Sequence, residues 1–201
     1  MFTLPVSRRA VLACASLALT PALALADDDD VQSGWTHDFY EVQTLVSDGS
    51  VPANAPPDAQ LVNGWGVAFN PQGFVWIADN GTGLSTLYDG TGAKNALVVK
   101  IPPAPGETQA SPTGIVYSGG TDFMVTGTTA TNTTASGAAR FIFASEGGQI
   151  TGWAPNVNLA MAFLAKDNSA SHTIYKNLAL GGDGTRHLLY AADFFNARID
   201  V

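Results

Sequence analysis

Short strand-forming runs separated by turn residues recur along most of the chain. Residues 66–89 give the clearest example, because runs at 66–69, 74–78 and 84–88 are separated by an Asn-Pro-x-Gly turn and a Gly-rich turn. Short apolar runs that are bounded by Gly, Pro and Asn are typical of buried strands. This segment therefore predicts a small antiparallel sheet.

The same order of strands and turns occurs twice more. The three repeat units span residues 61–100, 111–156 and 175–201. Asp79, Ser145 and Asp193 occupy equivalent positions, with spacings of 66 and 48 residues between them. Residues 126–139 are rich in Thr, Ala, Gly and Ser and lack apolar periodicity, which predicts a mobile surface loop inside the second unit.

Two motifs resemble a known β-propeller repeat. Residues 75–79, Val-Trp-Ile-Ala-Asp, and residues 189–193, Leu-Tyr-Ala-Ala-Asp, resemble the NHL type of repeat, whose signature ends in Asn-x-Arg-Ile. The third unit has this ending at residues 196–199, whereas the first unit has Gly-Leu-Ser-Thr instead. The third unit therefore matches the signature more fully than the first.

Further segments together resemble an uncharacterised family of exported bacterial propeller proteins. These segments are residues 65–69, 78–83, 112–116, 140–144 and 191–194. The resemblance covers about residues 35–201, and members of the family often occur in bacteria that sort secreted proteins with a C-terminal Pro-Glu-Pro signal of the PEP-CTERM type. It implies a fold and a compartment rather than an activity.

The repeat count leads to a fold prediction. A small sheet cannot bury both faces alone, and radial packing of about four to eight such sheets forms a propeller. We therefore expect an all-β fold in residues 35–201, a partial β-propeller with about three four-stranded blades. On this prediction the chain is the N-terminal part of a longer protein. The alternative is a complete three-unit domain of another all-β type.

The first 26 residues have the pattern of an export signal. Arg8 and Arg9 precede an apolar stretch at residues 10–19, and small residues at 24–26 suit cleavage before Asp27. A transmembrane helix is the less favoured alternative, because the apolar stretch is shorter than the about 20 residues that span a bilayer. We expect export by the general secretory or twin-arginine route to the periplasm or the outside of the cell.

Removal of this signal changes the composition of the mature chain. Residues 27–34 then form an acidic, flexible N-terminus, and the mature chain has no cysteine, because Cys14 is the only one. Loss of two arginines leaves 9 − 2 = 7 basic residues against 17 acidic ones, a net charge of −10. We therefore expect no nucleic-acid partner, no transmembrane segment in the mature chain and no disulfide.

The sequence contains no compact catalytic motif, and its three histidines are scattered. Trp65, Asn63 and Asn177 are the candidate ligand-binding residues, because they lie where innermost propeller strands begin. Asp79 and Asp193 recur at the end of the second strand of their units. A recurring acid more often serves the fold, and we expect both to accept backbone N–H bonds in an Asx-type turn.

These features predict an exported scaffold that binds a small molecule, a polysaccharide or another protein, with no demonstrable enzyme activity in this chain. The alternative is a Ca²⁺-dependent hydrolase of the lactonase or phosphotriesterase type, since these propellers hold Ca²⁺ on the axis with oxygen ligands. Asn63 and Asn177 would then contribute oxygens, although no acidic residue stands at the corresponding positions. A purely structural, surface-associated role is a third alternative.

Overall fold

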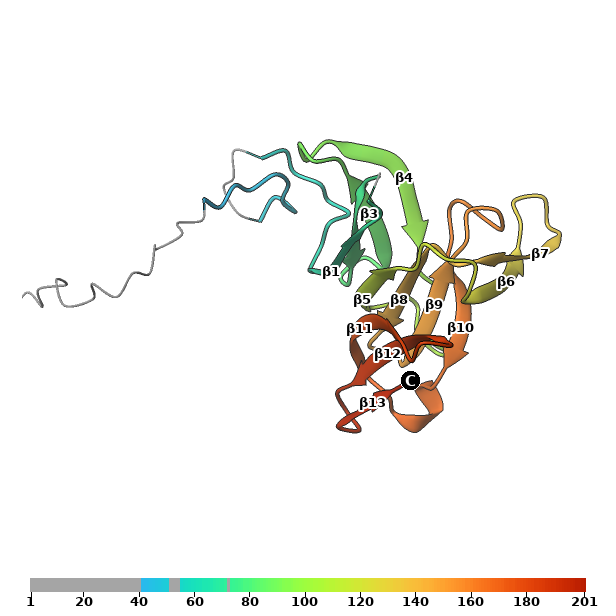
Figure 1. Cartoon of the computed structure of the whole chain (residues 1–201). Coiled ribbons are helices and arrows are strands. Elements are labelled where there is room, and N and C mark those ends of the chain that lie inside the picture. The colour runs from blue at the N-terminus through green and yellow to red at the C-terminus, as the bar shows by residue number, and fades with distance from the viewer. Residues whose placement is uncertain (1–40, 51–54, 72) are drawn as a thin grey trace, which may run out of the picture. The chain divides into compact units, whose positions relative to one another are not determined.

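The computed structural model describes residues 41–50, 55–71 and 73–201. The predicted export signal and the acidic stretch after it lie outside these residues. The chain divides between Glu41 and Val42, and the strands all belong to the unit that follows (Figure 1). The described residues form antiparallel sheets and contain no α-helix, which confirms the prediction of an all-β fold.

The first sheet is a four-stranded meander. Its strands are β1 (Gly64–Phe69), β2 (Val75–Asp79), β3 (Leu84–Tyr88) and β4 (Lys94–Lys100), each hydrogen-bonded to the next along the chain. Strand β2 alternates between two buried surfaces, because Trp76 and Ala78 face one side while Asp79 faces the other.

The second sheet also has four strands. They are β5 (Pro112–Tyr117), β8 (Phe141–Ser145), β9 (Gln149–Trp153) and β10 (Phe163–Asp167), in the order β10-β9-β8-β5. The fourth strand lies beyond residue 156, where the repeat unit was expected to end.

Residues 126–139 were predicted to be a mobile loop, and this prediction is wrong. Strands β6 (Met124–Thr128) and β7 (Thr134–Ala138) form an antiparallel hairpin between β5 and β8. Apolar periodicity was a poor guide here because the hairpin pairs small residues and hydroxyls, as in the 2.7 Å contact between Thr126 Oγ1 and Ser136 Oγ.

The third sheet has three strands. They are β11 (Tyr175–Gly182), β12 (His187–Asp193) and β13 (Arg198–Asp200). Within the described residues, β13 pairs only with β12, so its outer edge faces no other strand. Ile199 on this strand is 59% exposed.

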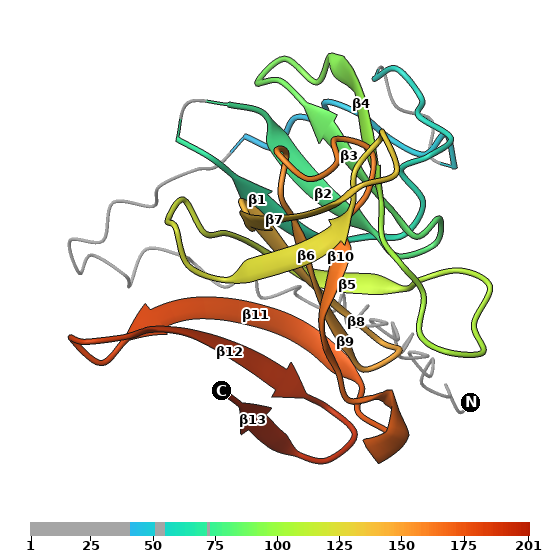
Figure 2. The same ribbon diagram turned by 90° about the vertical axis from the view of Figure 1, so that its right-hand side faces the viewer.

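The three sheets follow one another in chain order and meet through their first strands, β1, β5 and β11 (Figure 2). Glycines permit this close approach. A Cβ atom at Gly66 would lie 2.4 Å from the Thr113 carbonyl oxygen, and one at Gly114 would lie 2.6 Å from the Leu178 backbone nitrogen. Either substitution would push neighbouring sheets apart.

Two apolar cores fill the spaces between neighbouring sheets. An aromatic cluster of Trp76, Phe141 and Trp153 joins the first and second sheets, and the rings of Trp76 and Phe141 stack with their centroids 4.0 Å apart. The core between the second and third sheets is aliphatic apart from Tyr175, and Ile142 and Leu178 belong to it. Burial of these side chains stabilises the arrangement by about 1.5 to 3 kcal/mol each.

Candidate functional site

Six side chains from the three sheets gather at one end of the first strands. We call this group the inter-sheet cluster; its members are Asn63, Trp65, Asn80, Glu146, Lys176 and Phe194. Antiparallel pairing explains the gathering, because the start of each first strand lies opposite the end of the second. Gly64 pairs with Asp79, Pro112 with Ser145 and Tyr175 with Asp193.

A chain of hydrogen bonds links the polar members of the cluster. Asn63 Nδ2 donates to Asn80 Oδ1 at 3.0 Å, and Asn80 Nδ2 donates to Glu146 Oε2 at 3.0 Å. The ammonium group of Lys176 forms an ion pair with the other oxygen of Glu146. The first, second and third sheets are therefore connected by side chains that are far apart in the sequence.

The ammonium group of Lys176 also lies over two aromatic rings. Its Nζ atom is 4.7 Å from the ring centroid of Trp65 and 5.8 Å from that of Phe194, within the usual range for cation–π contacts. Burial alone would raise the pKa of Glu146, but hydrogen bonds from Lys176 and Asn80 outweigh it and lower the pKa. The carboxylate is therefore charged at neutral pH and balanced by Lys176.

Much of the aromatic surface in the cluster remains open to solvent. Trp65 is 47% exposed and Phe194 is 71% exposed, while Asn80 is buried and holds the polar chain in place. Exposed rings beside fixed polar groups offer both a flat apolar contact and directed hydrogen bonds, which is the usual composition of a binding site.

The structure brings together two of the three predicted binding residues. Trp65 and Asn63 belong to the cluster, whereas Asn177 is exposed and its side-chain oxygen accepts a hydrogen bond from the Leu178 N–H. Asn177 therefore lies outside the cluster, and its role in ligand binding stays a prediction.

Four members of the cluster escaped the sequence analysis. Asn80, Glu146 and Phe194 each directly follow one of the repeat positions Asp79, Ser145 and Asp193, and Lys176 precedes Asn177. These residues could have been found by comparing the position that directly follows each repeat position, because this position differs from one repeat unit to the next. Binding residues of repeat proteins are often found where the repeats differ.

The two repeated aspartates behave differently. Asp193 is 2% exposed and accepts hydrogen bonds from the N–H groups of Ile174 and Asn196 and from the side chains of Asn196 and Thr173. These bonds are those expected of a structural turn residue. Burial alone would raise its pKa, but the hydrogen bonds, led by that from the Asn196 side chain, lower it.

Asp79 does not form the expected Asx-type turn. It is 0% exposed, and neither carboxylate oxygen has a hydrogen-bond partner within normal distance. The N–H groups of Thr82 and Gly83 bond instead to the backbone carbonyl of Asp79. Burial raises the pKa of the Asp79 carboxyl to about 7, and the nearby polar groups of Thr86 offset this only in part.

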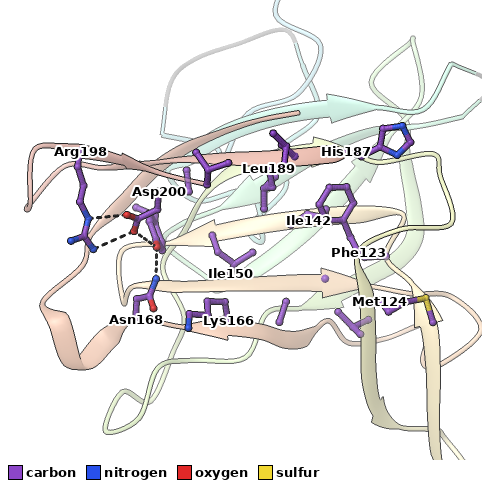
Figure 3. Close-up of a pocket in the computed structure, with 18 residues that line it drawn as sticks. Phe123, Met124, Ile142, Ile150, Lys166, Asn168, His187, Leu189, Arg198 and Asp200 are labelled. Atoms are coloured by element: carbon purple, nitrogen blue, oxygen red, sulfur yellow. Dashed lines mark hydrogen bonds and ion pairs between the residues drawn. The ribbon is translucent and has the colours of Figure 1, made fainter. Parts of the chain in front are cut away.

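A cleft of about 660 Å³ opens between the second and third sheets (Figure 3). Its walls are mainly apolar and include Ile142, Ile150 and Leu189. Asp200 lies at one end, where it accepts a hydrogen bond from the Tyr175 hydroxyl at 2.7 Å and pairs with Arg198. The cleft runs along β13, the strand whose outer edge has no partner in the described part of the chain.

The residues present do not suit a calcium ion. Among the described residues no three His, Cys, Asp or Glu side chains come close enough to hold a metal. Glu146 is neutralised by Lys176, and Asn63 and Asn177 do not converge. Since Ca²⁺ takes about six to eight oxygen ligands, the hydrolase alternative has no support in this geometry.

Comparisons with known proteins identify one relative and no family. No protein-family profile matches the sequence. The chain is 31% identical over 165 residues to the uncharacterised protein R648 of Acanthamoeba polyphaga mimivirus, and the alignment covers 81% of this chain. The chain spans only 38% of that viral protein. None of the described helices is long and apolar enough to cross a membrane.

Proposed function

We propose that the chain forms part of an exported β-propeller that acts as a binding scaffold, with the inter-sheet cluster as its binding surface. The arrangement of the sheets supports the propeller. Each of the first two sheets is a four-stranded antiparallel unit, and successive sheets adjoin through their first strands, as blades do around a propeller axis.

The observation that carries the binding role is the convergence of the cluster. Each of the three sheets supplies the residue that follows its second strand, namely Asn80, Glu146 and Phe194. Glu146 bonds to Asn80 and Lys176, and the Lys176 ammonium group lies over the exposed rings of Trp65 and Phe194. Loops that converge at one end of a rigid sheet scaffold commonly bind ligands, because the scaffold fixes their positions.

The charges in and around the cluster limit the class of ligand that it can bind. The charges of Lys176 and Glu146 compensate one another, and the mature chain is strongly acidic, with 17 acidic residues. A polyanion would be repelled by this net charge. The surface suits an uncharged polar ligand that stacks on Trp65, such as a neutral saccharide, or a protein loop of similar character.

Binding can be tested with a panel of neutral oligosaccharides and thermal unfolding of the full chain. We expect at least one compound to raise the Tm, and we expect Trp65→Ala and Glu146→Gln to abolish the effect. Phe69→Ala is a matched control, because Phe69 is also exposed on β1 but lies outside the cluster. The proposal fails if no compound raises the Tm, or if the Trp65→Ala variant responds as the native protein does.

Export rests on the pattern of residues 1–26 and needs its own test. Expression with the native N-terminus in a Gram-negative host should yield periplasmic or secreted protein that begins at Asp27, as read by N-terminal sequencing. Replacement of Arg8 and Arg9 by Gln should retain the precursor in the cytoplasm if the twin-arginine route is used. Full-length protein in the cytoplasm of both strains would contradict export.

A further inference from the structure

The buried carboxyl of Asp79 lies beneath a segment that closes over the first sheet. We call residues 58–63 the cover segment. Residues that pair across antiparallel strands share a face, so Asp79, Thr86 and Tyr88 point to the same side of the sheet. The other side carries Trp76 and packs against the second sheet.

The cover segment is fastened to the Asp79 side of the sheet by several hydrogen bonds. The Tyr88 hydroxyl donates to Asp58 Oδ2 at 2.5 Å, and Lys94 forms an ion pair with Asp58 at 2.6 Å. The N–H of Gly81 donates to the Val62 carbonyl at 2.9 Å. These bonds hold the segment over the side of the sheet on which Asp79 is buried.

This closed arrangement leaves polar atoms without partners. Both oxygens of Asp79 and the hydroxyl of Thr86 are buried and have no hydrogen bond within normal distance. A buried carboxylate without partners is costly, whereas a protonated carboxyl carries no charge and can donate a hydrogen bond. Opening of the cover segment would let water reach the carboxylate.

We propose that the cover segment closes over protonated Asp79 and is released when Asp79 ionises. Two charged groups act on Asp79 in opposite directions: Asp58 on the cover segment raises its pKa and Lys94 on β4 lowers it. Because Asp58 and Lys94 form an ion pair with each other, burial remains the main influence on the pKa of Asp79. Tyr88 on β3 is neutral, since burial and its hydrogen bond to Asp58 raise its pKa.

The direction of the pH effect follows from proton linkage. The closed form binds the Asp79 proton more tightly than the open, hydrated form, in which the carboxyl has its ordinary pKa of 3.8. Closure is therefore most favourable below about pH 4 and weakens as pH rises to about 7, where Asp79 ionises in the closed form as well. The opening equilibrium should rise by on the order of 100- to 1,000-fold across this range.

Opening would also alter the inter-sheet cluster. Asn63 ends the cover segment, accepts a hydrogen bond from the Asn80 N–H through its carbonyl and binds the Asn80 side chain. Release of the segment would withdraw Asn63 from the cluster. The closure itself is independent of any ligand, so it can be tested separately from the proposed binding function.

Amide hydrogen exchange of the full chain tests the proposal. The reporters are the N–H groups of Gly81 and Asn80, which bond to the cover segment, and the control is the N–H of Asn168, which bonds to Gly148 in the second sheet. After correction for intrinsic exchange rates, we expect protection of the reporters to fall about 100-fold between pH 5 and pH 8 while the control is unchanged. Asp79→Asn cannot ionise and should keep the reporters protected at both pH values.

A second measurement tests the same proposal on the native protein, in case the Asp79→Asn variant does not fold. A carbon-13 NMR titration of the native protein should place the ionisation of Asp79 near neutral pH. The proposal is overturned if this carboxyl titrates near 3.8, or if the reporters lose no more protection than the control between pH 5 and pH 8.

Discussion

The first and third sheets place an aspartate at the same point, the end of the second strand, and give it opposite surroundings. Asp193 is surrounded by donors and its pKa is lowered, whereas Asp79 has no partner and burial raises its pKa to about 7. Equivalent positions in a repeat therefore place a side chain at the same point of the sheet but do not give it the same hydrogen-bond partners or the same pKa. The covering residues decide its charge.

The turn after each aspartate explains much of the difference. In the third sheet Asn196 lies in this turn and Arg198 begins β13, and both reach Asp193, the guanidinium Nε at 3.4 Å. In the first sheet the corresponding stretch has Gly-Leu-Ser-Thr in place of Asn-x-Arg-Ile, so it has neither a side-chain amide nor a guanidinium group to donate to Asp79. The departure of the first unit from the repeat signature thus accompanies the loss of partners at Asp79.

The largest expected effect is that of Asp193→Ala. The substitution removes four hydrogen bonds and an ion pair, and it leaves the N–H groups of Ile174 and Asn196 without their side-chain acceptor. We expect the free energy of unfolding at pH 7 to fall by about 3 kcal/mol, measured by urea denaturation. Asp183→Ala, in an exposed turn, is the control and should cost much less. Equal losses in the two variants would contradict the structural role of Asp193.

The substitution Asp79→Asn should have the opposite sign. It replaces an unpartnered buried carboxylate by a neutral group of the same shape, so we expect the free energy of unfolding at pH 8 to rise by about 1 to 2 kcal/mol. The same change at Asp193 should lower it. A loss of stability in both variants would show that Asp79 has partners after all.

The dependence of stability on pH should separate the two sites as well. Asp79, with a raised pKa, lowers the free energy of unfolding progressively from about pH 4 to about pH 7. Asp193, with a lowered pKa, stabilises the protein above about pH 4, and this contribution is lost as pH falls through its folded-state pKa. Urea denaturation from pH 3 to pH 8 measures both effects. The fall in the free energy of unfolding between about pH 4 and pH 7 should vanish in Asp79→Asn, and the loss of stability at acid pH should be smaller in Asp193→Asn.

A hydrogen-bond donor like the one that Asn196 supplies to Asp193 can also be introduced next to Asp79. Thr82 lies three residues after Asp79, as Asn196 does after Asp193, so Thr82→Asn places an amide N–H₂ near the unpartnered carboxylate. We expect the pKa of Asp79 to fall by about 1, measured by carbon-13 NMR. Thr82→Ser, which keeps the hydroxyl that bonds to Gln60, is the control and should leave the pKa unchanged.

The sequence predicted the strands and turns of the repeat units more accurately than the site. The run at residues 66–89 and the motif at 189–193 became strands because apolar spacing and turn residues act locally. The hairpin of β6 and β7 was missed because hydroxyl and small-residue pairs carry no apolar period. Asn80 and Glu146 were missed because their hydrogen bond joins residues 66 positions apart.

The sequence by itself therefore determined an all-β chain of repeated antiparallel units. Those features depend on interactions between near neighbours along the chain. The tertiary structure alone decided that Asn63, Glu146 and Lys176 meet at one end of the sheets and that Asp79 is buried without a partner beneath residues 58–63. The environment of a side chain is set by segments distant in sequence, so equivalent residues of a repeat acquire different chemistry.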